Sequence, residues 1–180
     1  MPLYVALLRA VNLGGSTQVS MSALRDHLTG AGFEDIRTLL QSGNVVFRHR
    51  GRNASEIELR LEDTVARAFG RRTEVLVRTP SEWRTVVDRN PFREAAQTDP
   101  GHLTVLTLKE APLAEGWTRL AKSIVGPEQV RAAGREGYVL YPAGIGSSRL
   151  TLDRIERNLG TRGTLRNWNT VTKIDALLTK

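Results

Sequence analysis

Short apolar runs separated by polar turns fill the first half of the chain, and their order predicts a fold. Residues 3–9 are apolar at nearly every position, which predicts a strand buried on both faces. Apolar residues at helical spacing over 21–28 predict a helix, with Ser20 as its N-cap. Two further short strands flank 41–44, a turn of hairpin composition.

The same half of the chain closes with a second helix and a fourth strand. Apolar residues at helical spacing follow Ser55, the expected cap, and continue to Phe69. The segment 74–78 then predicts a strand. The resulting order, β-α-β-β-α-β, is the split βαβ arrangement of ferredoxin-like domains.

A similar pattern recurs after a helix that is expected to start at Thr79 and Pro80. The polar segment 90–101 contains two prolines and is predicted to be a linker or an exposed, mobile segment. The elements expected after it are a strand at 102–108, a helix at 113–125, strands at 129–132 and 138–141, and a helix at 151–159. No closing strand is predicted, and a helix at 170–178 ends the pattern.

The two halves resemble each other in sequence. Residues 32–47 (GFEDIRTLLQSGNVVF) align without a gap with residues 126–141 (GPEQVRAAGREGYVLY). The match favours a duplicated unit, although shared turn chemistry explains the same positions. We therefore expect an α+β fold of two ferredoxin-like (βαββαβ-type) units in tandem, at 1–79 and 80–180. The second unit is expected to be incomplete and to be followed by a C-terminal helix.

Composition narrows the class of protein. Lysine and arginine number 26 against 19 acidic residues, a net charge of +7, which favours an anionic partner such as nucleic acid or a phosphorylated small molecule. An arginine-rich surface without a dedicated site explains the same charge. The absence of cysteine excludes disulfides and thiolate chemistry. The histidines lack metal-ligand spacing, so no metal is expected. No apolar run reaches membrane length, so we expect a cytoplasmic protein without a membrane partner.

Polar residues from two loops are expected to meet at one edge of the first sheet. Strands that flank a right-handed βαβ crossover run parallel, so the first two strands end on the same side. The residues expected at this rim are Arg9, Asn12, Gly14, Gly15, Gln41, Ser42 and Asn44. They form a candidate binding cluster, in which the two glycines leave backbone N–H groups accessible. Ordinary turn chemistry at both loops is the alternative.

A glycine-rich loop between a strand and a helix is a second candidate for anion binding. Free N–H groups and a helix N-terminus favour an anion at such a loop, although it lacks the lysine spacing of a P-loop. Its candidate residues are Gly144, Gly146, Ser148 and Arg149. The alternative is a flexible turn in which Ser147, Ser148 or Thr151 caps the helix.

The segment 166–173 is a third candidate. Arg166, Asn169, Thr170 and Lys173 can hold a phosphate or a carboxylate. The alternative is structural, with an asparagine of this segment as the cap of the last helix and its tryptophan as a packing anchor.

Five motifs in this order resemble the bacterial domain-of-unknown-function family numbered 1697. They are YVALLRAVNLGG, QVSMSALRDHL, GFEDIRTLLQSGNVVF, YPAGIGSSRL and RNWNTVTKI. The resemblance implies a fold of two ferredoxin-like α+β units, and it implies no established activity, cofactor or catalytic residue. The family pattern often has glycine where this chain has Ala10 and lysine where it has Arg149.

The sequence thus predicts a non-catalytic binding protein for a small anionic or phosphorylated ligand, with no cofactor. One alternative is a protein that associates non-specifically with nucleic acid. Base stacking is weakly supported, because Asn44 and Val46 take the positions expected to carry aromatic residues. The other alternative is an enzyme of unidentified reaction, for which the sequence offers no nucleophile–base pair.

Overall fold

The computed structural model describes residues 1–11 and 19–179. The chain divides into two compact units, which we call unit 1 (Met1–Thr85 with Lys173–Lys180) and unit 2 (Val86–Thr172). The expected domain boundaries, 1–79 and 80–180, stay a prediction. The fold is a mixed α+β fold with one four-stranded antiparallel sheet in each unit.

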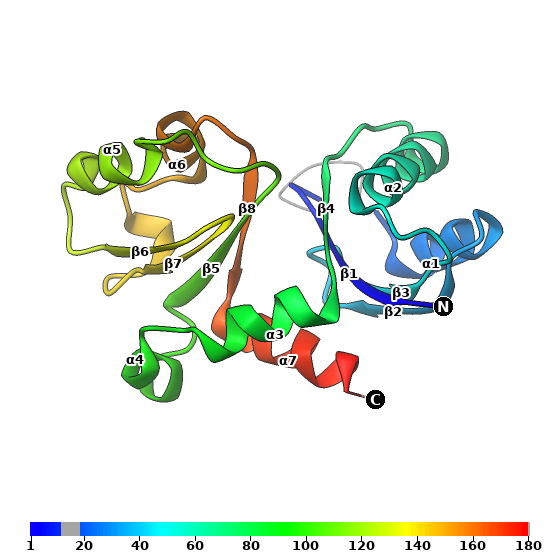
Figure 1. Cartoon of the computed structure of the whole chain (residues 1–180), viewed down its shortest axis with the longest axis horizontal. Helices are drawn as coiled ribbons and strands as arrows, with labels where there is room; N and C mark the ends of the chain where they lie inside the picture. Colours follow the sequence, from blue (N-terminus) through cyan, green and yellow to red (C-terminus); the bar gives the residue numbers. More distant parts are fainter. Residues whose placement is uncertain (12–18, 180) are drawn as a thin grey trace. The chain divides into compact units, whose positions relative to one another are not determined.

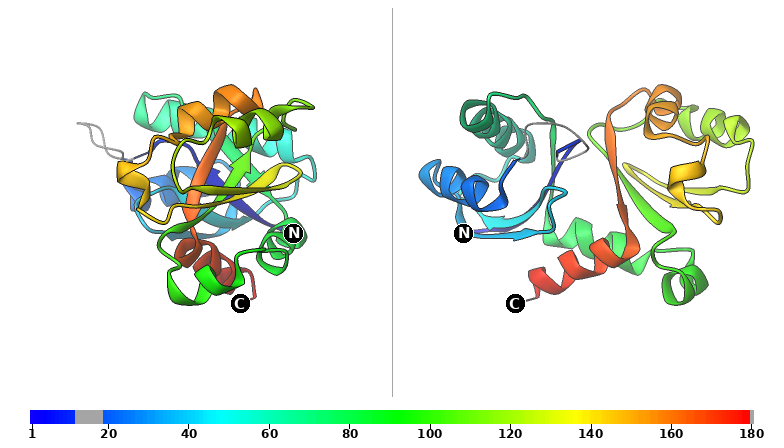
Figure 2. Two further views of the ribbon diagram at one scale, coloured as in Figure 1. Left: turned by 90° about the vertical axis from the view of Figure 1, so that its left-hand side faces the viewer. Right: turned by 180° about the vertical axis from the view of Figure 1, so that it is seen from behind.

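Unit 1 packs two helices on one face of its sheet (Figures 1 and 2). Its elements are β1 (Leu3–Leu8), α1 (Met21–Gly30), β2 (Glu34–Leu39), β3 (Asn44–Arg48), α2 (Ala54–Phe69) and β4 (Val75–Arg78). The strand order is β2-β3-β1-β4. Because β1 and β2 both pair antiparallel with β3, they run parallel to each other, as the crossover predicts. Leu24 and Leu28 of α1 and Leu61 of α2 pack on Tyr4 and Phe47.

Unit 2 has a sheet of the same strand order, β6-β7-β5-β8. Its elements are α4 (Arg93–Thr98), β5 (Leu103–Leu108), α5 (Gly116–Ser123), β6 (Gln129–Ala133), β7 (Glu136–Leu140), a 3₁₀ turn η1 (Ile145–Ser147), α6 (Leu152–Leu159) and β8 (Gly163–Asn167). Leu120 of α5 and Ile155 and Leu159 of α6 pack on one face of this sheet. Within the described residues, no helix is long and apolar enough to cross a membrane.

The prediction that unit 2 lacks a closing strand is wrong. The segment Gly163–Asn167 pairs antiparallel with β5 along its whole length. It escaped prediction because only Leu165 packs against the helix side, so the segment shows no apolar alternation. Backbone pairing to a neighbouring strand, rather than side-chain pattern, makes this segment a strand.

A helix follows the closing strand of each unit. α3 (Pro80–Asp88) begins with a capping box, in which Thr79 N donates to Glu82 Oε2 at 2.8 Å. α7 (Trp168–Leu178) begins where Thr170 N donates to Asn167 Oδ1 at 3.0 Å, so it starts two residues earlier than predicted.

Two further predictions about helices need correction. Asn53, and not Ser55, caps α2, because Asn53 Oδ1 accepts from Ser55 N at 3.0 Å. The segment predicted to be a linker contains α4, since its residues Arg93–Thr98 are mostly strong helix formers between two prolines. The Ser20 cap of α1 is confirmed, with Ala23 N donating to Ser20 Oγ at 3.4 Å.

The hairpins of the two units differ in length, so the gapless sequence alignment is shifted. In unit 1, Leu39 pairs with Asn44 across a turn at 40–43. In unit 2, Ala133 pairs with Glu136 across a turn at 134–135. The alignment thus places residues of β3 against residues two positions too far along β7. A shift of two keeps every side chain on the same face, which explains why the apolar positions still matched.

Candidate functional site

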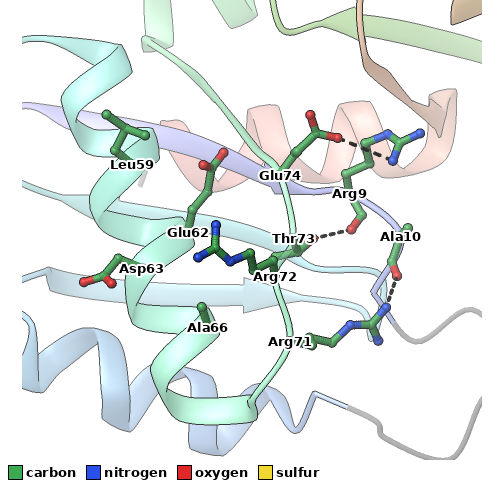
Figure 3. Close-up of a pocket in the computed structure, with 10 residues that line it drawn as sticks. All are labelled: Arg9, Ala10, Leu59, Glu62, Asp63, Ala66, Arg71, Arg72, Thr73 and Glu74. Atoms are coloured by element: carbon green, nitrogen blue, oxygen red, sulfur yellow. Dashed lines mark hydrogen bonds and ion pairs between the residues drawn. The ribbon is translucent and has the colours of Figure 1, made fainter.

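A cavity of about 480 Å³ lies at the edge of unit 1 where β1 ends and β4 begins (Figure 3). Both walls carry charged side chains. Its charged lining residues are Arg9, Glu62, Asp63, Arg71, Arg72 and Glu74. The volume is in the range of pockets that hold small molecules. Of the predicted rim residues that the structure describes, Arg9 lines this cavity.

The strand order fixes this cavity, because β4 pairs antiparallel with β1 and so starts beside its end. Gly70, with φ +64, ends α2 and turns the chain into a short loop before β4. Arg9 N donates to Glu74 O at 2.9 Å, and the Thr73 hydroxyl donates to the Arg9 carbonyl oxygen. The loop 71–74 is therefore fastened to the end of β1.

The acidic residues of the cavity all have partners. Glu74 Oε2 lies 3.5 Å from Arg9 Nη1. Asp63 Oδ2 lies 2.9 Å from Nη2 of Arg67, on the same helix. Glu62 Oε1 accepts a hydrogen bond from Val75 N at 2.9 Å. Each carboxylate is therefore compensated by a cation or by a backbone donor.

Two guanidinium groups of the cavity are not matched by an acid in the same way. Arg71 Nη2 donates to the Ala10 carbonyl oxygen, a neutral acceptor, at 3.2 Å. Arg72 is exposed, and none of the hydrogen bonds and ion pairs seen among residues 1–11 and 19–179 involves it. The loop before β4 thus presents positive charge to the cavity.

Ala10 is held in the left-handed region, with φ +53. A side chain there costs free energy that glycine avoids. This conformation accounts for the glycine that the family pattern often has at this position, and it directs the Ala10 carbonyl oxygen to Arg71.

The end of β1 also contacts the β2–β3 turn, as the predicted rim requires. Leu8 N donates to Gly43 O at 2.8 Å. A Cβ atom on Gly43 would lie 2.5 Å from Val11 Cγ2, so these backbones approach closely. The remaining members of the predicted rim from this loop, Asn12, Gly14 and Gly15, lie outside the described residues.

The Asn44 amide holds the turn together, which is the structural alternative considered for this position. Asn44 is buried, and its Nδ2 donates to Leu39 O and to Ser42 Oγ, both at 2.9 Å. Gln41 is exposed and Ser42 is half-buried. A ligand-binding role for these three residues stays a prediction.

The glycine-rich loop of unit 2 carries a carboxylate beside its hydroxyl. Gly144 has φ +83, a conformation that favours glycine. The Ser148 hydroxyl donates to Glu128 Oε1, and this hydrogen bond lowers the pKa of Glu128. Gly146 and Arg149 are exposed. The negative charge of Glu128 makes this loop a poorer anion site than its sequence suggests.

The third candidate segment combines a buried guanidinium and a helix cap. Burial lowers the pKa of Arg166 to about 10, and its Nη1 donates to the Leu165 carbonyl oxygen at 3.0 Å. The Thr170 hydroxyl donates to the Asn167 cap at 2.9 Å. Asn169 and Lys173 are exposed. Asn167 and Thr170 thus start the helix, while a ligand role of the four predicted residues stays a prediction.

Acid–base and metal-binding groups are sparse in the described part of the chain. His102 Nδ1 lies 2.7 Å from Asp99 Oδ2, a pair that the sequence analysis did not single out. Both side chains are about half exposed. Among the residues that the structure describes, no group of three or more histidine and acidic side chains is arranged to hold a metal ion.

Sequence reasoning missed Arg71, Arg72 and Glu62 as candidate site residues. A usable signal was present, because a β-α-β-β-α-β unit places its fourth strand beside its first and antiparallel to it. The charged loop before that strand therefore had to lie beside Arg9. The predicted rim rests on the parallel pair of strands alone, so it does not include this loop.

Comparison with known proteins supports the fold and the family. A search of curated proteins gives no match. The conserved bacterial protein SP0830 from Streptococcus pneumoniae has a similar solved structure, with a TM-score of 0.77 and 21% sequence identity. The match covers 100% of this chain and 99% of that chain, and at this identity it shows the fold alone. The profile of the family "Protein of unknown function (DUF1697)" matches residues 1–138, so the chain belongs to the DUF1697 family.

Proposed function

We propose that the protein binds a small anionic or phosphorylated ligand in the cavity of unit 1. The observation that carries this proposal is the adjacent pair Arg71 and Arg72, which lines the cavity without an acidic partner among the described residues. We also propose that the protein is bacterial, cytoplasmic and non-catalytic.

The chemistry of the cavity suits such a ligand. Guanidinium groups bind phosphate and carboxylate oxygens through paired N–H donors, and each such bond is stronger than a neutral one. Leu59 also lines the cavity and is 65% exposed, so it offers an apolar contact for a carbon skeleton. The cavity therefore combines a place for an anionic group with a place for an uncharged one.

Calorimetric titration with inorganic phosphate, glucose 6-phosphate and citrate tests the proposal. We expect at least one of these anions to bind, and Arg72→Ala and Arg71→Ala to weaken its binding about tenfold each. Arg52→Ala, an exposed arginine of unit 1 outside the cavity, is the matched control. Failure of all three anions to bind, or equal loss in the control, contradicts the proposal.

Non-specific association with nucleic acid is the alternative that the net charge of +7 favours. Val5, Leu7 and Val46 on the sheet face opposite the helices of unit 1 are aliphatic, so they offer no aromatic ring for base stacking. Titration with an oligonucleotide at two salt concentrations separates the two functions. Binding that falls steeply with salt and survives Arg72→Ala favours the nucleic acid.

We also propose that the two units are copies of one ferredoxin-like unit. The shared strand order supports this proposal, and so do equivalent hydrogen bonds at corresponding positions. Leu8 N donates to Gly43 O in unit 1, and Leu108 N donates to Arg135 O in unit 2. The helix that follows the closing strand is then part of the repeated unit.

A further inference from the structure

A further cavity, of about 450 Å³, lies in unit 2 between α4 and the ends of β6 and β7. Its lining comes from α4 and the residues just before it, from Gln129 at the start of β6, and from Leu140 and Pro142 at the end of β7. All of these residues belong to unit 2, so this cavity is distinct from that of unit 1. Its volume is in the range of pockets that hold small molecules.

α4 is held over this cavity at both of its ends. At its start, the guanidinium of Arg131 in β6 lies over the Phe92 ring, 5.6 Å from the ring centroid. At its end, His102 N donates to Asp99 O at 3.2 Å, and Tyr141 N donates to His102 O at 2.9 Å. His102 Nδ1 also lies 2.7 Å from Asp99 Oδ2. These contacts fasten both ends of α4 to the sheet, and the cavity lies between them.

Half of the residues that line the cavity are apolar. Phe92, Ala95 and Leu140 are half-buried, and Pro91 and Pro142 complete this part of the wall. Such a wall suits a hydrocarbon group, because the removal of apolar surface from water is favourable.

Two charged residues of the lining, Arg93 and Glu94, have no oppositely charged partner in the part of the chain that the structure describes. Arg93 Nη2 donates to the Asp88 carbonyl oxygen, a neutral acceptor, at 2.7 Å. The Glu94 side chain takes part in none of the hydrogen bonds and ion pairs seen among residues 1–11 and 19–179. The cavity thus offers one guanidinium and one carboxylate from adjacent positions of α4.

We propose that this cavity binds a free α-amino acid with an apolar side chain. The ammonium group of the amino acid binds Glu94 and its carboxylate binds Arg93. The apolar side chain packs against Phe92 and Leu140. A ligand with a single charge engages only one of the two charged residues, so the pair favours a zwitterion. This ligand class differs from the anion proposed for unit 1, and the two proposals are tested separately.

Titration of the whole chain, followed by nuclear magnetic resonance of its backbone amides, tests the proposal. The probes are L-leucine and three analogues that each lack one of its groups: isocaproate lacks the ammonium group, isoamylamine lacks the carboxylate, and glycine lacks the apolar side chain. We expect L-leucine to shift the amide resonances of α4 and to bind about tenfold more tightly than each analogue. Failure of L-leucine to bind, or equal binding of any analogue, overturns the proposal.

Two variants locate the charged groups. We expect the Glu94→Gln chain to bind L-leucine no more tightly than isocaproate, and the Arg93→Gln chain to bind it no more tightly than isoamylamine. Both side chains are exposed, so the fold should persist, and far-ultraviolet circular dichroism checks it. Glu110→Gln and Lys122→Gln, at exposed positions of unit 2 outside the cavity, are the matched controls. An unchanged preference in either variant, or an equal loss in the controls, overturns the proposal.

Discussion

Equivalent hydrogen bonds join the first and last strands in unit 1 and in unit 2, which gives the two units a common frame. The loops at the edges of the two sheets differ. Arg9 N and Lys109 N make equivalent bonds to the residue before the closing strand. The hairpin turn and the loop before the closing strand are both longer in unit 1. Backbone pairing conserves the frame, and the edge loops are free to acquire different charges.

The largest expected difference in stability between variants of the two units is at the hairpin glycines, Gly43 and Gly134. Gly43→Ala places a Cβ 2.5 Å from Val11 Cγ2 and 2.8 Å from Leu8 Cβ, in a residue with φ +76. We expect a loss of about 3 kcal/mol of unfolding free energy, measured by urea denaturation. Gly134→Ala in unit 2 has φ +69 but nothing within 4 Å, so it should cost only about 1 kcal/mol. Equal losses would show that the close approach in unit 1 is unimportant.

Glu62 and Glu156 each accept a hydrogen bond from the first residue of the closing strand of their unit, and their removal should cause smaller and unequal losses of stability. Glu156 is 6% exposed and binds both Gly163 N and Arg162, so Glu156→Ala should cost about 2 kcal/mol. Glu62 is only partly buried, and Glu62→Ala should cost about 1 kcal/mol. Urea denaturation measures both. A larger loss from Glu62→Ala would contradict the expectation that Glu156, with its two partners, contributes more to stability.

Substitution by glycine at the second residue after β1 and at the second residue after β5 should change the free energy of unfolding in opposite directions. Ala10→Gly relieves a φ of +53 and should stabilise the chain by about 0.5 kcal/mol, after the entropy gained by the unfolded chain is subtracted. Glu110, the corresponding residue of unit 2, has no positive φ, so Glu110→Gly should destabilise by about 0.5 kcal/mol. Thermal melting of the two variants shows whether the signs differ.

The smallest expected difference between the units concerns the stability that is lost at acid pH. His49 follows β3, and burial, with a contribution from Arg60, lowers its pKa below 6.5. The unfolded chain therefore binds the proton more readily, so this stability is present above pH 6.5 and is lost as the pH falls through the lowered pKa. At the corresponding position unit 2 has Tyr141, whose pKa burial raises, so it does not titrate in this range.

The variant His49→Asn keeps an acceptor for Gly51 N and removes the titration. We expect its melting temperature to fall less than that of the parent between about pH 7.5 and about pH 5. Equal falls would assign the acid sensitivity to other groups.

The sequence predicted most elements of both units, because apolar periodicity and capping residues agreed locally. It also predicted that the end of β1 meets the β2–β3 turn, which the hydrogen bond from Leu8 N to Gly43 O confirms. β8 was missed because a single apolar residue, Leu165, points to the helices. The charged cavity was missed because it depends on β4 lying beside β1, a contact between segments far apart in the sequence.

The glutamates of α2 have a consequence for how molecules of this protein meet one another. β4 is the outer strand of its sheet, and its outward N–H groups at Val75 and Val77 are taken by Glu62 and Glu58. An outer strand whose donors are already occupied, with carboxylates alongside, is a poor template for a strand from another chain. Glu62, which lines the cavity of unit 1, and Glu58, which does not, thereby also protect this edge of the sheet against aggregation.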